Sequence, residues 1–233
     1  MRRMRVISLN LNGIRAAARK GFYAWLRRQR ADVVCLQELK AQLEQLSDKA
    51  FWPPSFECYY HPAAKKGYSG VALYARREPD EVLQGLGWPD FDAEGRWIEA
   101  RFGQLSVVSL YLPSGSSSEL RQQIKFEFMD RLTPYLQALR ADGREYIICG
   151  DWNIAHTKAD IKNWRGNQKN SGFLPEERVL RRYLNPLLRE QGRNEGQQAL
   201  QIYMDAGEGG WNADSWGGVM RGVSRAGLDL SQA

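Results

Sequence analysis

The sequence contains little that could bind a metal through sulfur or imidazole: three cysteines and two histidines among 233 residues. It has no Cys-x-x-Cys pair, and no group of cysteines and histidines has the spacing of a four-ligand zinc site. The odd number of cysteines, with Cys35 and Cys149 inside apolar runs, indicates buried free thiols in a reducing compartment. The sequence therefore argues against a zinc module and against a disulfide-stabilised secreted domain.

Long hydrophobic runs are also absent. No run approaches the roughly 20 residues that span a membrane, and the apolar segment after the basic residues 1–5 is too short and too interrupted for a signal peptide. We therefore expect a cytoplasmic protein with no membrane partner. The hydrophobic fraction of 43% and the charged fraction of 26% are typical of one large globular domain or two small ones. The net charge of +6 favours polyanionic partners without specifying one.

Polar side chains follow four predicted strands at the point where each strand ends. The strands are the apolar or alternating runs at residues 4–12, 32–40, 104–111 and 146–149. The polar residues at their ends are Asn10 and Asn12, Glu38, Tyr111, and Asp151 with Asn153. If the four ends converge in the fold, they form an active site, whereas any one of them alone is an ordinary turn.

Asp151 and Asn153 carry the most specific chemistry of the four sites. They follow an apolar run that Gly150 ends, and side chains two residues apart at a strand end point toward the same face. A carboxylate and a carboxamide held together suit work on a phosphate, because one can take a proton while the other donates to an oxygen. This segment alone leaves open the alternative that both are turn residues.

Helical spacing marks three further segments. Residues 14–30 predict one basic amphipathic helix, whose arginines and lysines form either a solvated face or a stripe that binds nucleic acid. Apolar residues between 120 and 139 predict a second helix, which Pro134 kinks or divides. Pro175 marks the start of a third. Strands that alternate with helices in this way predict an α/β layered fold.

Six motifs together resemble a known family. SLNLNGIR, LQELK, GYSGVALY, SLYLPSG, GDWNIAH and NQKNSGFLPEER are similar, in order and spacing, to motifs of the exonuclease III and AP endonuclease family of metal-dependent DNA repair nucleases. The resemblance covers roughly residues 4–178, so we expect residues 1–178 to form a nuclease domain. It implies a four-layered α/β sandwich, in which two β-sheets are flanked by helices.

The resemblance also implies a role for each site residue. Glu38 would be the main carboxylate on Mg²⁺, with Mn²⁺ as a substitute, and Asn10 and Asn12 would support that metal site. The implied catalytic residues are Tyr111, Asp151 and Asn153. The implied substrate-binding residues are Lys125, Phe173, Leu174, Lys65 and Lys66. A structural role remains open for Tyr111, and an ordinary surface role remains open for the three lysines.

The sequence departs from the family's pattern in residues 179–233. The family's closing strands and its Ser-Asp-His motif, which completes the metal and proton-transfer machinery, are not found there. A polar, helix-like stretch to about Gln201 is followed by a glycine-rich tail without the alternation of closing strands. We therefore expect an atypical, poorly ordered C-terminal segment, and the C-terminal part of the second sheet is not predicted.

These observations lead to one expected function and two alternatives. The expected function is a monomeric, Mg²⁺-dependent nuclease that cleaves phosphodiester bonds at abasic sites or 3′ ends of duplex DNA, with catalysis impaired because the Asp-His motif is missing. The first alternative is a non-catalytic remnant that binds DNA through its basic surface. The second is a phosphoesterase of the same superfamily acting on another phosphate ester. The NQKNSGFLPEER segment favours DNA repair over the second alternative.

Overall fold

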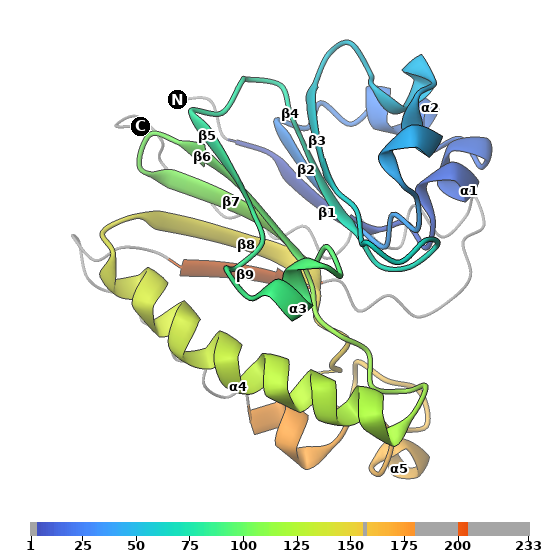
Figure 1. Cartoon of the computed structure of the whole chain (residues 1–233), viewed down its shortest axis with the longest axis vertical. Helices are drawn as coiled ribbons and strands as arrows, with labels where there is room; N and C mark the ends of the chain where they lie inside the picture. Colours follow the sequence, from blue (N-terminus) through green and yellow to red (C-terminus); the bar gives the residue numbers. More distant parts are fainter. Residues whose placement is uncertain (1–3, 156–157, 180–199, 205–233) are drawn as a thin grey trace.

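The computed structural model describes residues 4–155, 158–179 and 200–204 and shows two β-sheets with helices on their outer faces (Figure 1). The first sheet has the strand order β1-β2-β4-β3 and the second β5-β6-β7-β8-β9. The strands are β1 (Val6–Asn10), β2 (Val33–Gln37), β3 (Glu57–His61), β4 (Val71–Ala75), β5 (Glu81–Gln84), β6 (Trp97–Phe102), β7 (Leu105–Tyr111), β8 (Glu145–Asp151) and β9 (Leu200–Met204). The helices are α1 (Ile14–Arg19), α2 (Phe22–Arg27), η1 (Leu43–Leu46), η2 (Lys49–Phe51), α3 (Pro89–Asp92), α4 (Glu119–Ala141) and α5 (Trp164–Asn167).

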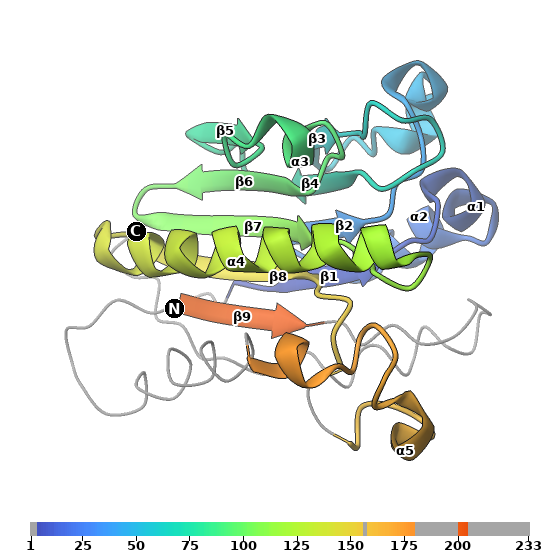
Figure 2. The same ribbon diagram turned by 60° about the horizontal axis from the view of Figure 1, so that its bottom comes forward.

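Three apolar layers hold the sheets and helices together. The two sheets pack face to face through one of them, α1 and α2 cover the outer face of the first sheet, and α4 covers that of the second (Figures 1 and 2). Burying one valine or leucine side chain in such a layer contributes roughly 1.5–3 kcal/mol. The predicted α/β four-layered sandwich is therefore confirmed.

Strand β2 is apolar at four consecutive positions, from Val33 to Leu36, because both of its faces are buried. Val33 and Cys35 lie in the layer between the sheets, whereas Val34 and Leu36 lie in the layer under α1 and α2. Both faces of the strand are covered, so each of these four residues is apolar. A polar contact joins the sheets at the end of β2, where buried Gln37 donates to Ser109 Oγ on β7 over 2.9 Å.

The strands that carry the predicted site run in parallel pairs. Strand β1 pairs in parallel with β2, and β7 pairs in parallel with β8. Parallel strands deliver their carboxyl ends to the same edge of a sheet. The residues that follow β1 and β2, and those at the ends of β7 and β8, can therefore meet where the two edges face each other.

The predicted helix over residues 14–30 is wrong in its length. The segment forms two helices, α1 and α2, with Gly21 between them in the left-handed region at φ 90°. That conformation suits glycine and ends a right-handed helix. The break lets Ile14 in α1 and both Phe22 and Leu26 in α2 pack into the same apolar layer.

Helix α4 continues through Pro134, so the proline does not divide it. A proline inside a helix removes one backbone hydrogen bond. The apolar face on both sides of it still packs on the second sheet, through Phe128, Leu132 and Leu136. The predicted helix start at Pro175 is confirmed, because residues 175–179 are helical.

The C-terminal part of the second sheet, which the sequence left in doubt, includes a strand at residues 200–204. Strand β9 pairs in parallel with β8 from Tyr146↔Leu200 to Gly150↔Met204, so β8 is not an edge strand. Parallel pairing uses main-chain groups, which explains why the weak alternation of the side chains did not reveal it. Residues 180–199 of the helix-like stretch predicted to about Gln201, and the glycine-rich tail, lie outside the described residues. Among the described helices, none combines the length and apolar character needed to cross a membrane.

Candidate active site

The four predicted strand ends meet at one place. The Asn10 side chain at the end of β1 donates to Asp151 Oδ2 at the end of β8 over 2.7 Å. The Tyr111 phenol at the end of β7 donates to Glu38 Oε1, just after β2, over 2.6 Å. Both bonds cross from one sheet to the other, so the convergence that the sequence left open is present.

Glu38 is the best-supported carboxylate of the site. Burial alone would raise its pKa, but hydrogen bonds from Lys40 and Tyr111 and the positive charge of Lys40 outweigh it and hold the pKa of Glu38 below its usual value. Glu38 Oε2 lies 2.6 Å from Lys40 Nζ. The carboxylate therefore stays ionised at neutral pH, as a metal ligand must be.

Lys40 is a site residue that the sequence analysis did not assign, although it ends the LQELK motif. Its ammonium bridges two predicted metal-site residues, because it also donates to Asn12 Oδ1 over 2.6 Å. Glu38, Lys40 and Asn12 all have positive φ angles, at 54°, 49° and 46°. Such angles are uncommon for glutamate and lysine, and strain of this kind clusters at functional sites.

Asp151 and Asn153 are tied to each other through the backbone. Asn153, at φ 49°, donates its main-chain N–H to Asp151 Oδ1 over 2.9 Å. Its side-chain amide donates to the Leu112 carbonyl over 2.8 Å, so the turn is also joined to the end of β7. Gly150 allows this close packing, because a Cβ atom there would lie 2.2 Å from the Leu110 carbonyl oxygen.

Tyr111 presents a protonated phenol to the site. Burial and then the negative charge of Glu38 raise the pKa of Tyr111 well above its usual value, and the positive charge of Arg96 opposes them. The hydroxyl therefore remains a hydrogen-bond donor at any physiological pH. The guanidinium of Arg96 lies 5.2 Å from the centre of the Tyr111 ring and donates to the Tyr111 carbonyl over 2.9 Å.

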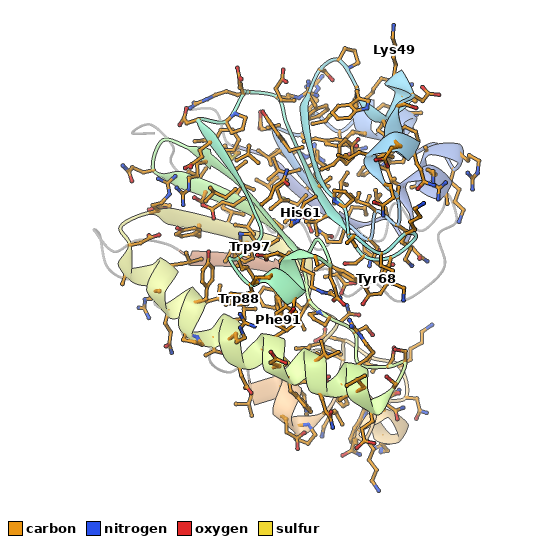
Figure 3. The ribbon with its side chains drawn as sticks, viewed as in Figure 1. Lys49, His61, Tyr68, Trp88, Phe91 and Trp97 are labelled. Atoms are coloured by element: carbon orange, nitrogen blue, oxygen red, sulfur yellow. The ribbon has the colours of Figure 1, made fainter. Side chains whose placement is uncertain are left out.

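A second set of residues, missed by the sequence analysis, surrounds Tyr68 in the loop between β3 and β4 (Figure 3). The Tyr68 hydroxyl accepts from Arg96 over 3.0 Å and from Arg121 over 2.5 Å. Glu94 binds both guanidinium groups, at 2.5 Å from Arg96 and 2.8 Å from Arg121. The loop and the start of α4 are thereby fixed beside Tyr111.

The structure corrects the role expected for Lys125. The side chain is fully buried, so it has no exposed surface with which to meet a DNA phosphate. Its ammonium instead forms an ion pair with Glu177 at 2.6 Å and donates to the Asn153 carbonyl over 2.7 Å. The apolar spacing of α4 predicts one buried face of the helix. It could not show that Glu177, from another element, would cover Lys125.

Two of the remaining predicted substrate-binding residues, Phe173 and Leu174, follow Gly172, whose carbonyl accepts from the Ala155 N–H near the Asp151–Asn153 turn over 2.8 Å. Phe173 is buried, with the Arg178 guanidinium 4.6 Å from its ring centre, and Leu174 is half-buried. Lys65 and Lys66 are exposed in the loop that leads to Tyr68, and Lys65 Nζ lies 5.4 Å from the centre of the Tyr68 ring. Their roles toward a substrate stay predictions.

The oxygen donors of the site suit a hard cation. Within the described residues, no three acidic, histidine or cysteine side chains gather into a metal site. The oxygen atoms there are those of the Glu38 carboxylate and the Asn10 and Asn12 amides, which accept hydrogen bonds from Tyr111, Lys40 and the Asn12 N–H. One carboxylate with neutral oxygens fits an ion such as Mg²⁺, which takes few protein ligands and keeps several waters.

Known proteins resemble this chain in sequence and in fold. The endonuclease/exonuclease/phosphatase family model matches residues 7–229. The chain is 37% identical over 176 residues to an exodeoxyribonuclease of Bacillus subtilis, covering 75% of this chain and 68% of that protein. It is also 37% identical over 177 residues to the DNA repair nuclease APEX1 of Danio rerio, covering 75% of this chain and 57% of the relative.

A solved structure of an AP endonuclease from Archaeoglobus fulgidus superimposes with a TM-score of 0.70. The match covers 94% of this chain and 82% of that one, and at 24% identity it shows the fold alone. The expected resemblance is thus confirmed by sequence relatives and by the fold. The chain belongs to the endonuclease/exonuclease/phosphatase family, as a hydrolase of the exonuclease III and AP endonuclease type.

Proposed function

We propose that this protein is a metal-dependent DNA repair nuclease that hydrolyses phosphodiester bonds at abasic sites or 3′ ends of duplex DNA, acting as a monomer. The observation that carries the proposal is the pair of hydrogen bonds between the sheets, Asn10 to Asp151 and Tyr111 to Glu38. They bring two carboxylates, a protonated phenol and an amide to one edge, and these groups can accept a proton and donate to developing negative charge in hydrolysis of a phosphate ester.

Each residue has a distinct task in the proposed reaction. Asp151 accepts the proton of the attacking water, and its bond from the Asn153 N–H keeps the carboxylate oriented. The Asn153 side-chain amide has one N–H beyond its bond to the Leu112 carbonyl and donates it to an oxygen of the scissile phosphate. The Tyr111 phenol does the same once the phosphate replaces Glu38 as its acceptor, where negative charge develops. Arg96 packs against the Tyr111 ring and holds it in place.

Glu38, Asn10 and Asn12 would hold the divalent cation, for which Mg²⁺ is the expected ion and Mn²⁺ a substitute. A bound divalent cation polarises the phosphate and neutralises the charge that develops on it. Lys40 supplies a further positive charge next to Glu38, at 2.6 Å. The oxygen-rich donor set supports Mg²⁺ over softer metals.

Cleavage of a duplex that contains one abasic site tests the proposal. The purified protein should cleave it in Mg²⁺, whereas Glu38→Ala or an excess of EDTA should abolish cleavage. A duplex without the lesion, with blunt and with recessed 3′ ends, separates endonuclease from exonuclease action. Wild-type protein that is folded and cleaves none of these duplexes in Mg²⁺ or Mn²⁺ would refute the proposal.

A second candidate is a DNA-binding remnant with little or no catalysis. It is favoured by the sequence, since the Ser-Asp-His motif is not found and a missing general acid or base lowers a rate by roughly 10²–10⁴-fold. Binding of the abasic duplex without cleavage, measured by fluorescence anisotropy, would select this candidate. A rate comparable to that of a related exodeoxyribonuclease would reject it.

A further inference from the structure

A buried ion pair lies directly behind the turn that carries Asp151 and Asn153. Lys125 Nζ is 2.6 Å from Glu177 Oε1, and both side chains are 0% exposed. Lys125 comes from α4, and Glu177 comes from the helical turn that Pro175 begins. Burying two charges costs several kcal/mol per ion. Their attraction offsets this cost only when the pair is well aligned and other hydrogen bonds satisfy the remaining polar atoms. The other partners of the pair therefore show what it holds together.

Those partners are two main-chain groups near the site and two side chains, because Gln122 Nε2 and Ser171 Oγ also donate to Glu177 Oε1. The ammonium of Lys125 donates a second hydrogen bond to the Asn153 carbonyl over 2.7 Å. Glu177 Oε2 accepts from the Leu174 N–H over 3.1 Å, and Oε1 lies 3.3 Å from Ser171 Oγ. The pair thus joins α4, the 171–174 loop and the turn at Asn153. A second contact supports this link, because the N–H of residue 155 donates to the carbonyl of residue 172 over 2.8 Å.

Asn153 needs such support because its backbone is strained. Its φ angle of 49° costs an L-residue roughly 1–2 kcal/mol, although asparagine tolerates it better than most residues. Residues in sparsely populated conformations persist only where their surroundings hold them. The hydrogen bond from Lys125 fixes the peptide plane that follows Asn153, and so limits rotation of the turn.

We propose that Lys125 and Glu177 are positioning residues: the ammonium holds the Asn153 carbonyl, the carboxylate holds the ammonium, and together they keep Asn153 and Asp151 aligned toward the scissile phosphate. The inference rests on the function proposed above for these two residues. It replaces the expected DNA contact of Lys125 with an action through Asn153. A shift of about 1 Å in a catalytic group can cost roughly 100-fold in rate, so small movements of this turn matter.

The electrostatics agree with this assignment. Burial lowers the pKa of Lys125, and the negative charges of Glu177 and then Asp151 oppose that effect. The charge of Lys125 is thus felt by Asp151 as well as by its direct partner.

The test replaces both charges at nearly constant volume, as Lys125→Met with Glu177→Gln in the full chain. Removing both partners avoids a lone buried charge, so the fold should be retained. The amide oxygen of the new glutamine can still accept from the Leu174 N–H, while the bond to Asn153 is lost. We expect kcat on an abasic duplex to fall about tenfold with KM within about twofold. The control is Glu99→Gln, a buried carboxylate on β6 that binds Arg101 and Ser106.

Amide hydrogen exchange provides a readout that does not depend on activity. In the double variant, exchange of residues 150–155 should be at least about tenfold faster, while β1 and β2 exchange as in the wild type. Unchanged exchange at 150–155 overturns the proposal, whatever the activity. Equal acceleration across both sheets also overturns it, because the pair would then be a general stabilising element.

The exchange result also separates this inference from the proposed function. If the wild type cleaves no DNA but the double variant shows faster exchange confined to 150–155, the proposed function fails and the holding of the turn stands. If the double variant does not fold, Lys125→Met with Glu177→Met takes its place, because a hydrophobic pair of similar volume can replace a buried ion pair without a lone charge. Faster exchange confined to residues 150–155 and 171–174 in that variant supports the proposal, and wild-type exchange there overturns it.

Discussion

The side-chain amide of Asn10 donates to Asp151 Oδ2 over 2.7 Å, although 141 residues separate them in the chain. The bond joins the end of β1 in one sheet to the end of β8 in the other, at the edge where Tyr111 meets Glu38. The site therefore exists only when both sheets are formed and packed together. Changes at this edge should affect catalysis, and equivalent changes elsewhere should not.

Replacing Glu38 by glutamine keeps the volume of the side chain and removes its charge. The variant should cleave an abasic duplex about 100-fold more slowly than the wild type, because it lacks the carboxylate proposed to hold the cation. Steady-state rates in Mg²⁺ measure this. Glu44→Gln, at an exposed acid in η1, should retain the full rate. Equal rates for Glu38→Gln and the wild type would contradict the assignment.

Replacing Tyr111 by phenylalanine removes only the hydroxyl that donates to Glu38. We expect kcat to fall about 100-fold, the typical cost of losing one donor to a developing negative charge. The matched control is Tyr146→Phe, because Tyr146 lies on β8 and donates to the Asp142 carboxylate away from the site. If the two variants lose the same small amount of activity, Tyr111 has a structural role.

The lowered pKa of Glu38 predicts a specific pH dependence of stability. Because the pKa is lower in the folded protein, the carboxylate stabilises the fold above its unfolded pKa of about 4.3, and this stabilisation is lost as the pH falls through the folded pKa. In Glu38→Gln this contribution to the acid-induced fall in stability should be absent.

Lys40→Met should bring the folded pKa of Glu38 closer to its unfolded pKa, since Lys40 supplies the nearest positive charge to Glu38 at 2.6 Å. The pH range over which the stabilisation is lost should therefore become narrower. Unfolding midpoints in urea, measured from about pH 6 to about pH 2 for the three proteins, test both statements. Identical pH dependence in all three would show that the folded and unfolded pKa values of Glu38 are the same.

Gly150→Ala should destabilise the fold by packing rather than by backbone conformation. The added Cβ atom would lie 2.2 Å from the Leu110 carbonyl oxygen on the neighbouring strand. We expect a loss of about 3 kcal/mol in the free energy of unfolding. In contrast, Gly21→Ala meets no atom within 4 Å and strains only a φ angle of 90°, at a cost of about 1 kcal/mol. Urea denaturation curves compare the two, and a larger loss at Gly21 would reverse this interpretation.

Local sequence determined most of the elements and most of the site. Alternation and apolar runs identified the strands that lead to Asn10, Glu38, Tyr111 and Asp151. A strand with one buried face alternates every two residues, and a strand covered on both faces is apolar throughout. The six motifs identified the family. These features depend on neighbours in the chain, so they can be read without the fold.

Tertiary structure decided the features that depend on partners far apart in the chain. Lys125 has a charge suited to DNA, but Glu177, 52 residues later, covers and neutralises it. Strand β9 is defined by its main-chain pairing with β8, which lies about 50 residues earlier in the chain. The residues around Tyr68 come from the segment just before β6 and from α4. The sequence alone determined which groups were available for chemistry, and packing of the two sheets decided which of them meet, because hydrogen bonds and ion pairs depend on distance in space rather than along the chain.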